Sequence, residues 1–134
     1  MVLRHDSDKD VREAAAGALG EIGPEAKKAV PDLTAMLDDR EPYAQGEAGL
    51  ALWRITHDTN WVSRFTAELQ KATNAQQYRT YLDLLALIGP EAKSAVPVIL
   101  AGTTNFHTEM SRPVRAALRR IDPEAVSMLK PIKQ

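Results

Sequence analysis

The apolar residues of this chain recur every three or four positions, the pattern of helices that bury one face. A first stripe occupies positions 11, 15, 18, 19 and 22. A second follows at Val30, Leu33, Met36 and Leu37. The same pairing returns with Tyr81, Leu84, Leu85 and Ile88, followed by Val96, Ile99 and Leu100. No alternating stretch is long enough to predict a strand, so the pattern predicts an all-α protein of about eight helices in antiparallel pairs.

The helical pairs return at a constant distance along the chain. Ile22, Ile55, Ile88 and Ile121 stand 33 residues apart. A lone helical pair cannot bury its apolar face, so stacked neighbours must supply the core, and small residues at 14–17 permit close helix approach. We therefore predict one domain over 1–134, an alpha-solenoid (α–α superhelix) of about four two-helix repeats with this period. The predicted units are approximately 6–38, 39–71, 72–104 and 105–134.

A ten-residue segment joins the two helices of a unit. "IGPEAKKAVP" at 22–31 returns as "IGPEAKSAVP" at 88–97. Gly23 and Gly89 stand where a helix ends in a left-handed residue, and the proline that follows suits the first turn of the next helix. Pro31 and its counterpart Pro97 lack the N–H of an uninterrupted helix, which predicts a short turn and a bend before the second helix. These tasks favour a structural joint over a ligand-binding loop.

The repeated stretch resembles a known family. "VREAAAGALGEIGPEAKKAVPDLTAMLDD" is similar to the HEAT-like repeat of bacterial proteins, also called the phycobilisome-lyase HEAT-like repeat. Units one and three match its pattern, unit four keeps "AALRRIDPEA", and unit two has Thr56-His57 in place of Gly-Pro. The resemblance implies an α-solenoid whose second helices line a concave surface. Leu3 aligns with Met36, as if it ended a preceding helix, so we expect the chain to belong to a longer array.

Composition narrows the function classes. Charged residues make up 26% but nearly cancel, to a net charge of −1, and aromatic residues are only 5%. This balance argues against a nucleic-acid partner. The chain has no cysteine, which excludes disulfides and thiolate chemistry. No apolar run approaches a membrane span and no signal peptide opens the chain, so we expect no membrane partner and a cytoplasmic location.

No residue pattern indicates a catalytic, metal or cofactor site. His5, His57 and His107 stand at different positions of the repeat, and the His-Glu pairs of the di-iron HEAT family, the deoxyhypusine hydroxylases, are missing. Neither a nucleophile motif nor a phosphate loop accompanies the polar residues. We expect no enzyme and no cofactor.

Unit two departs most from the repeat. Trp53 stands where the other units have Gly20, Ala86 and Arg119, and Trp61 stands where they have Lys28, Ser94 and Ser127. Exposed Trp and Arg residues are typical of interaction hot spots. The helical spacing of Trp61, Val62, Phe65 and Leu69 favours a core stripe instead. The sequence leaves both interpretations open and favours the core.

The resulting functional expectation is a non-catalytic scaffold that binds another protein along its concave surface. The candidate contacts are the solvent-side residues of the second helices: Lys27, Lys28, Asp32, Trp61, Arg64, Glu68, Lys93 and Ser94. Two alternatives remain. The resemblance implies a bilin lyase or isomerase that loads a chromophore, and some HEAT-like proteins bind nucleic acid along a basic groove.

Overall fold

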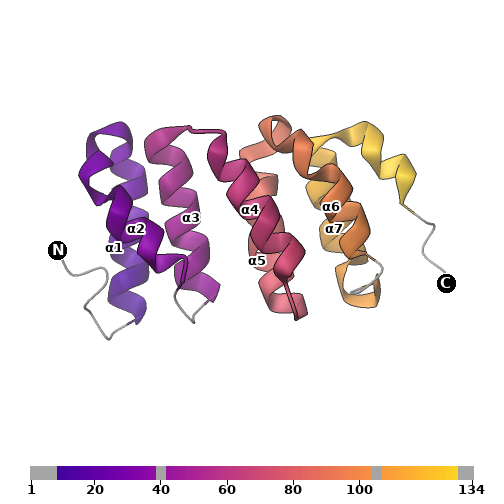
Figure 1. The fold of residues 1–134 in the computed structure, drawn as a ribbon, viewed down its shortest axis with the longest axis horizontal. Coiled ribbons are helices and arrows are strands. Elements are labelled where there is room, and N and C mark those ends of the chain that lie inside the picture. Colours follow the sequence, from indigo (N-terminus) through magenta and orange to yellow (C-terminus); the bar gives the residue numbers. More distant parts are fainter. Residues whose placement is uncertain (1–8, 39–41, 104–106, 130–134) are drawn as a thin grey trace. The chain divides into compact units, whose positions relative to one another are not determined.

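A computed structural model describes residues 9–38, 42–103 and 107–129 of the chain, and every element in these ranges is helical (Figure 1). The predicted all-α class is confirmed at this level. The chain divides into two compact units, Met1–Asp58 and Thr59–Gln134. In a solenoid all the helical pairs would stack on one another in a regular order. That arrangement and the division into four repeats remain predictions.

The described part of the first unit contains three α-helices and a short 3-10 helix. In chain order these are α1 (Lys9–Ile22), η1 (Gly23–Ala29), α2 (Val30–Met36) and α3 (Pro42–Thr56). Helices α1 and α3 pack side by side, and α2 packs against α3 in front of them (Figure 1). The core contains fully buried Leu33 and Leu52.

The apolar stripe predicted for α1 is wrong in part. Ala16 is completely buried and Gly20 is buried, whereas Ala18 is exposed and Ile22 is 56% exposed. A Cβ atom added to Gly20 would lie 3.0 Å from the Cα atom of Ala51. The smallest side chains therefore face α3, and Ile22, two residues or about 200° further round the helix, points away from that contact.

The second unit has two layers of helices. Helices α5 (Ala75–Ile88) and α7 (His107–Ile121) form one layer, and α4 (Asn60–Lys71) and α6 (Val96–Gly102) lie in front of it (Figure 1). The 3-10 helices η2 (Gly89–Ala95) and η3 (Pro123–Met128) follow α5 and α7. The predicted stripe of α5 is confirmed, because its four apolar residues are all buried: Tyr81, Leu84, Leu85 and Ile88.

Each Gly-Pro joint extends over seven residues of 3-10 type rather than forming a short turn, and the first joint is kinked at Ala26, where φ is −85° and ψ is 18°. Gly23 has φ 77° and Gly89 has φ 82°, so the expected positive φ is confirmed, although ψ of −138° takes Gly89 out of the left-handed helical region. In η2 the residues Gly89, Ala92 and Ala95 are buried. Their spacing of three matches the 3-10 repeat, which places them on one face. Sequence analysis missed this element because only the packed structure shows which alanines are buried.

The joint after α3, where Thr56-His57 replaces Gly-Pro, is built differently. His57 takes φ 46°, and its backbone N–H donates to the carbonyl of Trp53 at 2.8 Å. The Thr56 hydroxyl donates to the Leu52 carbonyl at 2.7 Å and accepts from the backbone N–H of Asp58 at 3.2 Å. A Trp53–His57 edge contact, with centroids 5.2 Å apart, accompanies this turn. Side-chain hydrogen bonds thus support a helix end that lacks glycine.

One segment, Ala75–Gly102, is long and apolar enough to cross a membrane by length and composition alone. This differs from the expectation that no such run exists. The segment is not a single straight helix, because Gly89 ends α5 and η2 precedes α6. Many of its large apolar side chains, among them Tyr78, Leu82 and Ile99, are buried in the core of the second unit, whereas Leu87 is exposed. Core packing accounts for part of this hydropathy, since 44% of the apolar window is buried.

Candidate functional site

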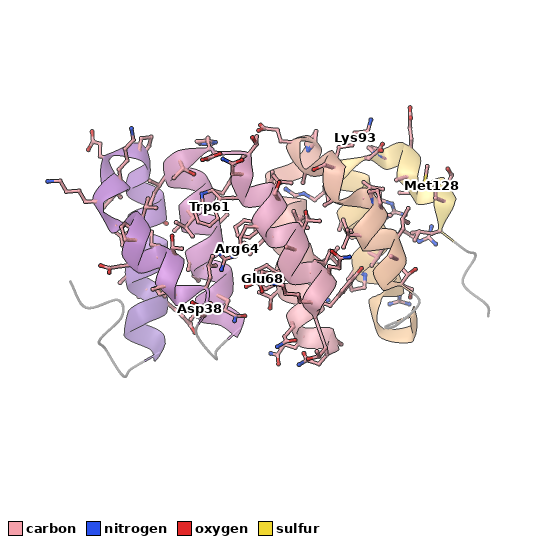
Figure 2. The ribbon with its side chains drawn as sticks, viewed as in Figure 1. Asp38, Trp61, Arg64, Glu68, Lys93 and Met128 are labelled. Carbon is pink, nitrogen blue, oxygen red and sulfur yellow. The ribbon has the colours of Figure 1, made fainter. Side chains whose placement is uncertain are left out.

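One side of α4, next to its buried stripe, carries the candidate residues that the structure brings together. Trp61, Arg64 and Glu68 stand at positions i, i+3 and i+7, which lie on one side of a helix, and they follow one another along α4 (Figure 2). All three are partly exposed, with 39% of the Arg64 side chain and 28% of the Glu68 side chain accessible. We call these three residues the α4 face.

The inward face of α4 fixes this surface on the core. Val62, Phe65 and Leu69 are buried and bind α4 to the second unit. The core stripe favoured by the sequence is therefore confirmed for these three residues. Trp61 is neither a core residue nor a fully exposed one, because its side chain is partly buried.

An aromatic row runs from the α4 face into the core. The Trp61 ring stacks on Phe65 at a centroid distance of 5.9 Å, and the Phe65 ring lies 6.1 Å from that of Tyr81. Phe65 is completely buried and Tyr81 is 4% exposed. Because its ring stacks on the buried Phe65 ring, Trp61 is supported by the core on one side while it stays partly accessible.

The charges of the α4 face pair along the helix. Arg64 Nε lies 3.4 Å from Glu68 Oε1, and Lys71 Nζ lies 4.0 Å from the same oxygen. Solvent-exposed pairs of this kind contribute little to stability. They orient the guanidinium group and the carboxylate at the surface, where a partner can exchange the pair for its own charges.

Lys93 and Ser94 are exposed on η2, away from the charges of α4. Lys93 Nζ lies 3.9 Å from Asp122 Oδ2, the residue that precedes η3. This contact links the joint after α5 to the joint after α7. Lys93 therefore has a structural contact in addition to its candidate role in binding a partner.

The remaining candidates belong to the first unit. Lys27 and Lys28 are exposed on η1, and Asp32 is partly buried in the first turn of α2. An acidic side chain is favoured at that position by the helix dipole. All three residues belong to consecutive elements of the first unit, η1 and α2.

The second tryptophan is a core residue. Trp53 is 8% exposed and packs against His57. The other units have small or polar residues at the aligned position, so the repeat alignment did not reveal that Trp53 is buried. His5 and the side chain of His107 lie outside the described residues. Within the described ranges, no three or more His, Asp or Glu residues form a group that could hold a metal ion.

Burial raises the pKa of the Tyr78 phenol above its ordinary range. The hydroxyl of Tyr78 donates to the carbonyl of Ile99 at 2.8 Å, and the residue is 1% exposed. The group therefore links α5 to α6 inside the core and has no access to a substrate.

The family model that describes HEAT repeats matches residues 2–60, less than half of the chain. This match supports the HEAT-like resemblance and leaves its phycobilisome-lyase type a prediction. No curated protein and no solved structure matches the chain.

Proposed function

We propose that this chain is a non-catalytic repeat scaffold that binds another protein along the second helices of its repeats. One observation carries the proposal. The α4 face presents a partly exposed tryptophan beside an arginine and a glutamate, on a helix that is anchored by the adjacent buried stripe of Val62, Phe65 and Leu69. HEAT repeats commonly serve as protein-interaction scaffolds, and the family match includes the first unit.

The chemistry of the α4 face suits a binding hot spot. Tryptophan and arginine are enriched where a few residues supply most of the affinity. Stacking on Phe65 orders Trp61 before any partner arrives, so binding loses less side-chain entropy. The charged neighbours add selectivity, because a partner must offer groups that replace the Arg64–Glu68 contact.

The proposal extends to the arrangement expected from the resemblance. In an α-solenoid with a 33-residue period, the second helices would line one concave surface, and Lys27, Lys28 and Asp32 would contribute to it. Further repeats of a longer array are part of the same proposal. Nucleic acid is a poor partner, because the net charge of −1 supplies no overall attraction to phosphates.

The test begins with the whole chain immobilised and exposed to a soluble extract of its source organism. A recovered protein is identified by mass spectrometry, purified, and titrated against wild type and the variants Arg64→Glu and Trp61→Ala by calorimetry. We expect each variant to weaken Kd by about tenfold or more, the effect of a hot-spot residue.

Arg112→Glu is the matched control, since it makes the same charge change at an exposed position of α7 in the same unit. It should leave Kd within about twofold. Equal binding by wild type, Arg64→Glu and Trp61→Ala would refute the α4 face as the interface. A spectral shift of an added bilin, with no protein partner recovered, would favour the chromophore alternative instead.

A further inference from the structure

A groove opens between α5 and α7, in the layer of the second unit that does not contain α4. It has a volume of about 350 Å³, and small residues from both helices line it: Ala86, Ala116 and Ala117. Leu87 borders it and is 48% exposed. The groove therefore combines an apolar wall with enough room for a side chain.

A charged group stands at the same end of the groove as Leu87. Gly89 follows α5 directly, and a Cβ atom built on it would lie 3.8 Å from the backbone oxygen of Arg120. The last turn of α7 is thus next to the end of α5, two residues beyond Leu87. Arg120 is exposed, and no ion pair to it is found among the described residues.

The other arginine of the groove already has a partner. Arg79 Nε donates to both carboxylate oxygens of Asp83, at 3.0 and 3.2 Å. This leaves Arg120 as the lining cation without a paired carboxylate in the described part of the chain. An incoming carboxylate would meet Arg120, and an apolar side chain would meet Leu87 and the alanines.

The chain contains an internal contrast for this groove. In the first unit a depression of the same kind is lined by α1 and α3, with Glu13, Glu21 and Glu47 around it. The residues 66 positions later are Arg79, Leu87 and Pro113. At the three positions where the first groove has glutamates, the second has one basic and two apolar residues. The first groove is therefore acidic, whereas the second is apolar with basic residues, although both lie between the same kind of helices.

We propose that the α5–α7 groove docks an acidic segment of a partner protein, with one apolar side chain over Leu87 and a carboxylate on Arg120. Charge complementarity selects this occupant: arginine pairs with carboxylates through directed hydrogen bonds, and a basic segment would be repelled. The groove lies in the first-helix layer, so the proposal does not rest on the α4 face.

The experiment uses a displayed library of random twelve-residue peptides, selected on the full-length chain. We expect enrichment of sequences that place Asp or Glu beside a large apolar residue. A synthetic peptide of the leading sequence is then titrated against the variants by fluorescence polarisation. Arg120→Glu and Leu87→Ser should each weaken its Kd by about tenfold or more.

The control Arg119→Glu makes the same charge change at the neighbouring exposed residue, which does not line the groove, and Kd should stay within about twofold. A peptide with lysine in place of its acidic residue should regain affinity for Arg120→Glu. Selection of basic or neutral peptides would overturn the proposal. So would a Kd that changes with Arg64→Glu but not with Arg120→Glu. Self-association of the chain that Leu87→Ser abolishes would also overturn it, because the occupant would then be a second copy.

Discussion

Replacing Gly102 by alanine should destabilise the second unit, although alanine favours a helix more than glycine does. Gly102 is the last residue of α6, and a Cβ atom there would lie 2.3 Å from Tyr78 Cε2 and 2.7 Å from the Tyr78 hydroxyl. The ring has no free space to move into and is held in place, because Tyr78 is 1% exposed and its hydroxyl donates to the Ile99 carbonyl. The new methyl group must therefore displace a buried ring.

The magnitude follows from three opposing terms. Overpacking a core costs about 1–3 kcal/mol. Losing the Tyr78–Ile99 hydrogen bond costs about 0.5–1.5 kcal/mol more. Against these, the helix preference of alanine restores at most about 1 kcal/mol, and less at a helix end. The net loss is about 2 kcal/mol, which would lower the urea midpoint by about 1 M.

The assay is urea unfolding followed by fluorescence in a Trp53→Phe background. Trp61 is then the only tryptophan, and because it stacks on Phe65 it reports on the second unit. Gly17→Ala is the control, since its new methyl group would meet only the Glu47 carboxylate at 3.4 Å. That variant, followed by far-UV circular dichroism, should gain up to about 1 kcal/mol.

A second background decides whether the Tyr78 ring is the cause. In Tyr78→Leu the ring is absent, so adding Gly102→Ala should be neutral or mildly stabilising. The reasoning is refuted if Gly102→Ala leaves the midpoint unchanged in wild type. It is equally refuted if the loss is the same with leucine at position 78.

Three further predictions concern the same framework. Gly89→Ala should cost about 1–2 kcal/mol in urea unfolding, because φ of 82° strains any residue with a Cβ, although the new methyl group would meet the Arg120 carbonyl only at an ordinary contact distance of 3.8 Å; an unchanged midpoint would contradict this. Phe65→Ala should cost about 3–5 kcal/mol and Trp61→Ala clearly less, since only the first residue is completely buried; equal losses would show that Trp61 is a core residue. The raised pKa of Tyr78 means that the folded state disfavours the phenolate, so stability is complete below the unfolded pKa of about 10 and falls as the pH rises above it; urea titrations between pH 8 and 11 should show a smaller fall in Tyr78→Phe.

The α4 face and the α5–α7 groove make separate demands on a partner. The α4 face offers a fixed tryptophan with two charges of opposite sign. The groove offers an apolar wall and Arg120. Since they lie in different layers of the second unit, a variant of one should leave binding at the other intact. Comparing Arg64→Glu with Arg120→Glu against any one partner therefore assigns its binding surface.

Local chemistry made several features readable from the sequence. The helical class, the positive φ of Gly23 and Gly89 and the first-turn prolines follow from residues close together in the chain. The same holds for the buried stripe of Val62, Phe65 and Leu69, whose spacing alone places it on one side of α4.

Tertiary packing decided what spacing could not. In α1 every candidate for the buried face is small or apolar, and the position of α3 selected Ala16 and Gly20 over Ile22. The groove brings Leu87 and Arg120 together from two helices, with no local pattern to announce it. Helix periodicity determines which residues share a side of a helix. Which sides are covered, and what stands across a groove, depends on neighbouring helices brought close by the fold.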